Sequence, residues 1–472
     1  MAALENSYRD NLSSEFYSDQ LPVPVQNPDI ICFNHDLADT LNLPKELSNP
    51  EVAINFLSGK EALNGTHPIA QAYAGHQFGQ FTMLGDGRAV LLGESVRDGH
   101  RFDIQLKGSG VTKYSRRGDG RATLSSMLRE YLMSEAMHHL GIKTTRSLAV
   151  VKTGESVYRE QVNDGAILTR IAESHIRVGS FEYARYYTDQ LAAFTKYVIK
   201  RHDPDLFESE NYALEFLNRV MNRQIDLIVD WMRVGFIHGV MNTDNMSIAG
   251  ETIDYGPCAF MNAYHINTVF SSIDRQGRYA FGNQPRIAHW NLAILANALL
   301  PLIAKDEKEA VNQAEQMIQS FPGLYEVSYY KMMVNKLGIV HASLEDRKLV
   351  DELLALLQKH HVDYTNFFVS LRYNSVEQKL AEDSVYQSWQ KKWDQARSRN
   401  NSLEEGLKLM DQNNPVVIPR NHLVEEVLKK AVEGDIDPFN QLMTKLSKPY
   451  THQDMQYVPS DFDESYQTFC GT

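Results

Sequence analysis

The chain has 472 residues, of which 43% are hydrophobic and 23% charged, and its formal net charge is −13 at pH 7. This composition is typical of an ordinary globular protein, and the length leaves room for two or three packed lobes. The negative charge argues against nucleic acid as a partner, because nucleic-acid-binding proteins usually carry a basic surface. The three cysteines lie far apart without a C-x-x-C pair, so they indicate neither a zinc site nor a secreted disulfide framework.

The first 65 residues are interpreted as a leader segment with one short helix between Pro44 and Leu57. The first twenty residues are polar and acidic, and they contain neither the apolar core of a signal peptide nor an Arg-rich transit pattern. The most apolar run, from Ile287 to Ala304, is interrupted by polar residues and a proline, which favours a core helix over a membrane span. We therefore expect a protein of the reducing cytoplasm without a membrane partner.

A Gly- and Gln-rich stretch begins at residue 66 and runs into the turn Gly85-Asp86-Gly87, which Arg88 follows. Apolar segments lie on both sides of this turn, so we predict two strands that form a hairpin around it. Turns of this kind are common, and most of them contact no phosphate.

The segment from Phe102 to Lys107 alternates apolar and polar residues, which predicts a strand with Lys107 on its polar face. A glycine-rich loop follows in which several lysines and arginines stand against one acid, Asp119. The apolar spacing then predicts a helix from Thr123 to Leu140, which carries Glu130. Beyond it, strand-like segments lead to Arg170 and Arg177. Taken one at a time, each of these charges could equally lie on a solvated surface.

After about residue 186 the pattern is mostly helical. A long buried helix is predicted between Leu214 and Trp231. Further helices are predicted over 287–304, 308–319, 344–360, 385–397 and 421–432. The segment from Ser447 onward is rich in Pro, Tyr and Asp, and we expect it to run over the surface to Cys470.

The stretch from His238 to Gly256, HGVMNTDNMSIAGETIDYG, contains the strongest chemical signal. A polar turn ends at the pair Asp244-Asn245, and an apolar–turn–apolar segment, interpreted as a short hairpin, leads to Asp254. An amide oxygen from Asn245 and a carboxylate from Asp254 are hard ligands of the kind that Mg²⁺ prefers.

Protein kinases use the same parts, since H-R-D-x-x-x-x-N supplies an Asn and D-F-G an Asp to the metal. Asn245 lies seven residues after His238, as in kinases. The kinase base would lie two residues after the histidine, where this chain has Val240, which cannot accept a proton. Asp244, beside the metal Asn, is the nearby carboxylate that could act instead.

The order of these parts predicts an α+β, protein-kinase-like fold of two lobes. The mixed α/β N-lobe is expected over 66–185 and the mostly helical C-lobe over 186–446, with the leader segment 1–65 and a tail over 447–472. Lys107 and Glu130 would form the strand-lysine to helix-glutamate pair that orients nucleotide phosphates in such folds.

Several stretches together resemble one family. PIAQAYAGHQFGQF, QLKGSG, SRRGDGRA, LTRIAESHIRVGSFEY, HGVMNTDNMSI and TIDYGP are similar to the SelO (YdiU) family of kinase-like protein adenylyltransferases. This resemblance implies that ATP is inverted relative to kinases. AMP would then pass to a Ser, Thr or Tyr hydroxyl of a protein substrate, and pyrophosphate would leave, with Mg²⁺ or Mn²⁺ as the cofactor.

The resemblance also implies roles for individual residues. Asp244 would be the proton acceptor, Glu130 would position Lys107, and Asn245 and Asp254 would hold the metal. The residues implied in nucleotide binding are Gly85, Gly87, Arg88, Lys107, Asp119, Gly120, Arg170 and Arg177.

The family's C-terminal tail is linked to redox control, and this chain has Cys470 three residues from its end. Cys258 is a candidate partner for Cys470, although a free, buried Cys258 is an equal alternative. Two other functions also remain open at this point: a kinase that uses Asp244 as its base, and a catalytically silent ATP-binding scaffold.

Overall fold

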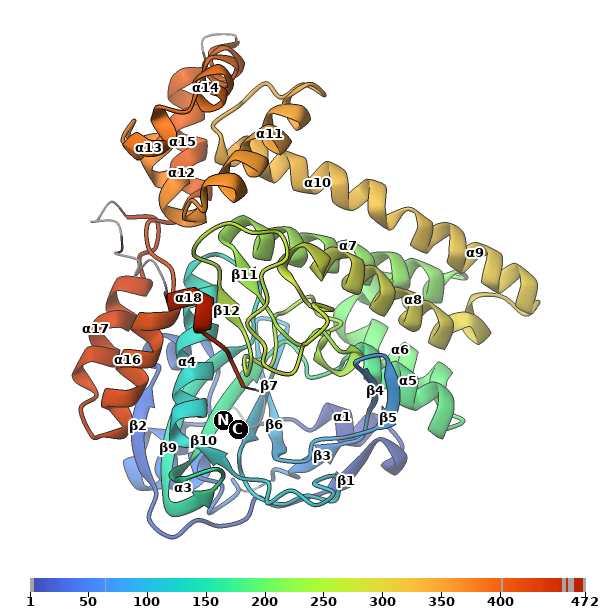
Figure 1. Cartoon of the computed structure of the whole chain (residues 1–472). Coiled ribbons are helices and arrows are strands. Elements are labelled where there is room, and N and C mark those ends of the chain that lie inside the picture. Colours follow the sequence, from blue (N-terminus) through green and yellow to red (C-terminus); the bar gives the residue numbers. More distant parts are fainter. Residues whose placement is uncertain (1–3, 64, 400–401, 452–455, 457–461, 470–472) are drawn as a thin grey trace.

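The computed structural model describes residues 4–63, 65–399, 402–451, 456 and 462–469. The chain is a mixed α/β protein in which an antiparallel sheet lies beside a larger mass of helices (Figure 1). Strands come mainly from the first 172 residues, and helices dominate afterwards.

The main sheet has eight strands and every pairing in it is antiparallel. Seven of them follow the order β1-β3-β6-β7-β10-β9-β2, and β8 pairs with β10. Their bounds are β1 Tyr17–Asp19, β2 Asp29–Phe33, β3 Ile69–Gln71, β6 Ala89–Arg97, β7 His100–Lys107, β8 Ala122–Thr123, β9 Arg146–Tyr158 and β10 Val162–Ala172. Two small sheets pair β4 (Ala74–Gln77) with β5 (Gln80–Met83) and β11 (Phe236–Ile237) with β12 (Ala259–Phe260).

The alternation along β7 places its side chains on two different faces of the sheet. Ile104 and Leu106 are fully buried in a hydrophobic cluster with Phe56 and Leu57, which end the helix α3 (Pro50–Leu57). Each such side chain contributes roughly 1.5–3 kcal/mol when it is buried. The first 65 residues thus cover one face of the sheet, and they also supply its two edge strands.

The opposite face of the sheet carries α4 (Leu124–His139), which begins with a capping bond from Ser126 N to the Thr123 side chain. The long helix α7 (Tyr212–Val234) ends at Gly235, whose φ of +74° provides the left-handed cap. The remaining α-helices of the described chain are α1 Ser7–Asn11, α2 His35–Thr40, α5 Val178–Tyr187, α6 Leu191–His202, α8 Gln284–Ile303, α9 Glu307–Gln319, α10 Phe321–Lys336, α11 Asp346–His360, α12 Tyr364–Arg372, α13 Gln378–Ala381, α14 Ser384–Arg397, α15 Leu403–Asn413, α16 Asn421–Val432, α17 Asp437–Leu446 and α18 Phe462–Ser465.

The predicted helices are confirmed, because α4, α7, α8, α9, α11, α14 and α16 each cover the predicted range to within a few residues. Helix α8 is the one helix of the described chain that is long and apolar enough to cross a membrane by length and composition. It packs against α5, α7 and α9, and Leu292, Leu295 and Leu299 are fully buried. It is therefore a core helix, as predicted.

Two local predictions are wrong in their pairing, and a third is wrong in its exposure. The strands around Gly85 exist, but β5 pairs with β4 while β6 pairs with β3 and β7, so they form no hairpin with each other. The segment after Asn245 does turn, at residues 248–249, but its two limbs bridge to other parts of the chain, Ser247 to Arg177 and Thr252 to Thr144. The predicted surface tail is also partly buried.

The tail returns to the body of the protein within its described part. Thr468 is buried, bridges to Ser271 in parallel and donates its hydroxyl to the carbonyl of Pro257 at 2.7 Å. Tyr466 donates to Glu425 at 2.7 Å. Cys470 lies outside the described residues.

Candidate active site

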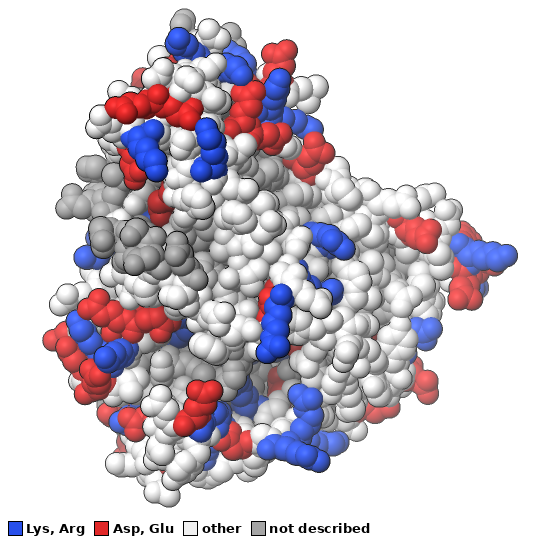
Figure 2. Space-filling view, in the orientation of Figure 1, with Lys and Arg blue, Asp and Glu red and all other residues white. Residues whose placement is uncertain are grey.

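A cavity of about 550 Å³ lies where the ends of the sheet strands meet the loops around Asp244 and Asp254. On the face drawn in Figure 2, Lys and Arg side chains border a hollow. All twelve residues that the sequence assigned to nucleotide, metal and proton chemistry line this cavity: Gly85, Gly87, Arg88, Lys107, Asp119, Gly120, Glu130, Arg170, Arg177, Asp244, Asn245 and Asp254.

At the base of the cavity, two cations and two carboxylates form a buried cluster. Lys107 Nζ lies 2.6 Å from Glu130 Oε2 and 2.6 Å from Asp254 Oδ1. Arg170 Nη1 lies 3.3 Å from Glu130 Oε1 and 2.9 Å from the same Asp254 oxygen. Burial alone would raise the pKa of Asp254, but Lys107 and Arg170 outweigh it and hold that pKa well below its usual value. Asp254 is therefore ionised at neutral pH.

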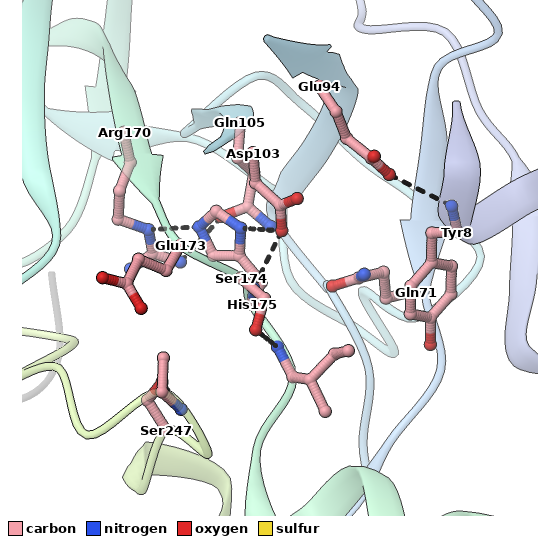
Figure 3. A network of polar contacts seen from close by, with 12 residues as sticks. Tyr8, Gln71, Glu94, Asp103, Gln105, Arg170, Glu173, Ser174, His175 and Ser247 are labelled. Carbon is pink, nitrogen blue, oxygen red and sulfur yellow. Dashed lines mark hydrogen bonds and ion pairs between the residues drawn. The ribbon is translucent and has the colours of Figure 1, made fainter. Parts of the chain in front are cut away.

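The Arg170 side chain is fixed by further contacts behind this cluster. Its Nη2 donates to Gln105 at 2.7 Å, and its Nε contacts His175 Nε2 at 3.2 Å. The other ring nitrogen of His175 lies 3.0 Å from Asp103, so His175 bridges Arg170 and Asp103 (Figure 3). Asp103 and Gln105 occupy the same face of β7 as Lys107 and are almost fully buried. The polar face of this strand is thus an interior surface of the site.

Arg177 is held over the cavity from a second direction. It precedes α5, and its guanidinium stacks on the Tyr73 ring, 4.3 Å from the centroid. Its Nη1 donates to the carbonyl of His175 at 3.2 Å and lies 3.7 Å from Asp86. Although buried, it keeps its charge, because the neighbouring acidic groups raise the pKa of Arg177 against the effect of burial.

The glycine turn forms one wall. Gly85 has a φ of +140°, and a Cβ there would lie 2.4 Å from the Tyr114 ring, so only glycine fits. Gly120 has a φ of +67°, and a Cβ there would meet the Gly110 carbonyl carbon at 2.1 Å. The backbone of both turns thus approaches its neighbours too closely for any side chain at these two positions.

Asp119 differs from the deeper residues, because its carboxylate is engaged by its own loop. It accepts from Arg121 N at 2.9 Å and from Arg159 Nη1 at 2.7 Å. Its side chain is 47% exposed. Asp119 therefore shapes the loop at the rim of the cavity.

Asp244 and Asn245 end a short 3-10 turn, Thr243–Asn245. Asp244 is 9% exposed, and Gln77 Nε2 donates to its Oδ2 over a long distance of 3.5 Å. Its Oδ1 is buried and has no hydrogen-bond partner among the described residues. Burial raises the pKa of Asp244 to about 6, and Arg177 limits the rise. A carboxylate with a free oxygen and a pKa near neutrality is suited to accept a proton.

Asn245 and Asp254 can be tested as a metal site on their geometry. The Asn245 amide nitrogen donates to the carbonyl of Val240 at 3.1 Å, which leaves its oxygen as the free donor atom. Asp254 has a φ of +64°, a strained conformation for a non-glycine residue that orients its carboxylate toward Lys107. Among the described residues no three His, Cys, Asp or Glu side chains could hold a metal by themselves. An amide and one carboxylate fit Mg²⁺, which takes its other ligands from phosphate and water.

His238 has a structural role at this site. Its Nε2 contacts the carbonyl of Ile253 at 2.9 Å and its backbone N–H donates to Gln284 at 3.0 Å. Burial lowers the pKa of His238, so it is neutral. It joins the turn before Asp244 to the residue before Asp254.

Sequence reasoning missed three groups that line the cavity, Tyr73, Gln77 and Asp86, and it missed Gln105, which bonds to Asp86 and Arg170. Asp86 accepts from Gln71 N at 3.1 Å and from Gln105 Nε2 at 3.2 Å, and it is buried beside Arg177. Its position between two glycines was a signal that could have been used. The other three depend on contacts between distant segments, which no local pattern reveals.

Cys258 is fully buried, and its thiol donates to the Tyr255 carbonyl at 3.3 Å. Its own carbonyl accepts from Arg129, which also contacts Tyr466 in the tail. The described tail thus reaches the neighbourhood of Cys258, although the predicted partner Cys470 lies outside the described residues.

The chain is similar to known proteins over nearly its whole length. The family model described as "Protein adenylyltransferase SelO" matches residues 3–447. The chain belongs to the SelO family. It is 53% identical to "Protein nucleotidyltransferase YdiU" of Clostridium perfringens (strain SM101 / Type A), over 99% of this chain and 97% of the relative. It is 50% identical to the protein of the same name from Bacillus cereus (strain G9842), over 99% and 98%. This SelO-family chain is accordingly a nucleotidyltransferase.

Proposed function

We propose that this SelO-family enzyme transfers AMP from ATP to Ser, Thr or Tyr hydroxyls of protein substrates and releases pyrophosphate. One observation carries the proposal. The poorly bonded carboxylate of Asp244 shares a cavity with a buried set of cations, while Val240 occupies the position of the kinase base. The cavity therefore offers more cationic side chains for binding phosphate than the transfer of a γ-phosphoryl group needs.

The proposed layout is that of a kinase with two lobes, divided at residues 66–185 and 186–446. The ion pair between Lys107 on β7 and Glu130 on α4 supports this layout, because kinases use a strand lysine and a helix glutamate in the same way. In our proposal Lys107, Arg170 and Arg177 hold the polyphosphate deep in the cavity. The planar forks of the two arginines suit bidentate contacts with phosphate oxygens.

Asn245 and Asp254 are proposed to hold Mg²⁺ or Mn²⁺, which would stabilise negative charge on the phosphates during transfer. The chain's own groups then account for the remaining chemistry. The acceptor oxygen attacks the α-phosphorus, the bond from that phosphorus to the bridging oxygen of the β-phosphate breaks, and pyrophosphate leaves. The hydroxyl proton passes to Asp244. Lys107 and the arginines stabilise the charge that develops on the departing oxygens.

The direct test is to incubate the protein with ATP labelled at either the α- or the γ-phosphate, with Mg²⁺ or Mn²⁺ and a mixture of acceptor proteins. We expect the α-label on protein hydroxyls and the γ-label in pyrophosphate. Transfer of the γ-label alone would establish a kinase. Nucleotide binding without transfer of either label would establish a silent scaffold.

We place this reaction in the cytoplasm. Among the described residues Cys32 is a free thiol, which is usual in a reducing compartment.

A further inference from the structure

A second cavity, of about 480 Å³, adjoins the active site. Phe78 and Ile273 line both cavities, so the two lie side by side. The second cavity is formed by the loop before α8 and by the first turn of that helix. Figure 2 shows Lys and Arg side chains, with few acids between them, over the loops that precede α8.

Three arginines line this cavity: Arg275, Arg278 and Arg286. None of them makes an ion pair with a carboxylate in the described part of the chain. Arg275 and Arg286 are exposed, whereas Arg278 is half-buried over the Trp290 ring, 4.9 Å from its centroid. The Arg278 Nε is buried without a hydrogen-bond partner among the described residues. This side chain therefore has an unsatisfied donor.

The one acid in the lining does not neutralise these arginines by direct pairing. Asp274 is 5% exposed, and its two carboxylate oxygens accept from the backbone N–H groups of Arg278 and Tyr279, at 2.8 and 2.7 Å. Its role is to close the turn. The N-terminus of α8 adds to the positive field, since no side chain caps its first turn. A cavity of this charge, in a chain of net charge −13, is suited to an anion.

The position of the cavity indicates which anion. The turn between β4 and β5 lies beside both cavities, because Gln77 lines the first and Phe78 lines both. Gln77 contacts Asp244, while Phe78 donates its N–H to Asn242 at 3.0 Å and packs its ring on Tyr279, 5.1 Å between centroids. An extended segment of a protein substrate advances about 3.3–3.6 Å per residue. When its hydroxyl reaches Asp244, the residues beside that hydroxyl would therefore extend past Phe78 into the second cavity.

We infer that this cavity binds the acidic residues that flank the acceptor hydroxyl in a protein substrate. The inference rests on the proposed function, and it assigns that function a substrate class: hydroxyls next to Glu or Asp in an extended segment. The guanidinium groups would pair with the carboxylates, and Phe78 and Ile273 would contact the backbone and apolar side chains between them.

The test measures binding apart from catalysis. Two fluorescein-labelled peptides of equal length carry a central Phe in place of the acceptor, flanked by Glu in one and by Gln in the other. Fluorescence anisotropy is recorded with enzyme saturated by a non-hydrolysable ATP analogue, so that the peptides cannot occupy the phosphate site. We expect the Glu peptide to bind about tenfold more tightly, since exposed ion pairs contribute up to roughly fivefold each. The difference should shrink in high salt.

The variant R275E/R286E should bring the two peptides to equal affinity. These two arginines are chosen because they are exposed, whereas Arg278 packs on Trp290. The control K305E/K308E makes the same change in net charge with exposed lysines at α9 that form no ion pair with a described residue, and it should keep the preference. Transfer of the α-label to acceptor proteins, assayed on the same wild-type preparation, reports the proposed function separately.

Equal binding of both peptides by the wild type, or a preference that survives in R275E/R286E, would overturn the inference even if the α-label is transferred. Weaker binding of the ATP analogue by R275E/R286E would also overturn it, because the cavity would then belong to the nucleotide. If no α-label is transferred, the proposed function fails, and the inference fails with it.

Discussion

The role of Asp244 can be tested by replacing its carboxylate with an amide of the same shape. In Asp244→Asn the side chain loses its negative charge and its ability to accept the hydroxyl proton. The structure predicts little disturbance elsewhere, since Oδ1 has no hydrogen-bond partner among the described residues and Oδ2 has only the 3.5 Å contact from Gln77. Lys107 and Arg170, which are proposed to hold the polyphosphate, do not contact Asp244.

We therefore expect Asp244→Asn to bind ATP with nearly wild-type affinity while AMP transfer falls by roughly 10²–10⁴, the usual contribution of a general base. This loss corresponds to about 3–5 kcal/mol of activation free energy. Transfer is measured with α-labelled ATP in single-turnover assays, and binding by isothermal titration calorimetry. A wild-type rate of transfer would refute the role of Asp244.

Asp254→Asn is the matched comparison, because it makes the same chemical change at the other carboxylate of the cavity. There the amide leaves Lys107 and Arg170, both buried, with Glu130 as their one carboxylate partner among the described residues. We expect it to lose both nucleotide binding and transfer, together with some stability, since removing one partner of a buried ion pair is strongly destabilising. If both variants lose binding and transfer in parallel, the separate roles proposed for the two carboxylates are wrong.

Three further predictions follow from neighbouring groups. Arg177→Lys keeps the charge but loses the stacking on Tyr73 and the planar fork, so ATP affinity in calorimetry should fall about tenfold; an unchanged affinity would place Arg177 outside the phosphate site. Burial raises the pKa of Glu251 well above its usual 4.5, so the folded protein holds this proton more tightly and loses stability as pH rises above 4.5. Glu251→Gln should therefore raise the melting temperature increasingly between pH 5 and 8 and have no such effect near pH 4, whereas a constant difference would contradict the linkage. Oxidation should link Cys258 to Cys470 and slow transfer in the wild type but not in Cys470→Ser; a wild-type rate that reductant leaves unchanged, with no linked peptide, would refute this.

The sequence predicted the elements of the site well because their signals are local. The alternation of β7 and the apolar spacing of α4 are each contained in one segment, so the positions of Lys107 and Glu130 followed from them. The adjacency of Asp244 and Asn245 and the seven-residue step from His238 are likewise local. Such patterns determine which face a residue occupies, and therefore which residues can meet in one cavity.

Partners that come from distant segments could not be predicted in this way. The strands on either side of Gly85 were assigned to each other, but β5 pairs with β4 and β6 with β3 and β7. Arg170 is bonded to Gln105 and His175 as well as to carboxylates. The position of a basic residue in the sequence does not reveal such partners. The pairing and register of strands depend on which arrangement buries more apolar surface across the whole chain. The sequence of a single segment does not determine this.

The charge of the chain shows why a sum over the sequence is a weak guide to small ligands. A net charge of −13 argues against an extended polyanion, because such a partner contacts a large area of surface. A nucleotide or a short acidic segment is influenced mainly by charges within a Debye length, about 8 Å at physiological ionic strength. Within that range the first cavity presents Lys107, Arg170 and Arg177, and the second presents Arg275 and Arg286. The acidic remainder of the surface repels anions elsewhere, so this charge distribution would direct a small anionic ligand to these two cavities.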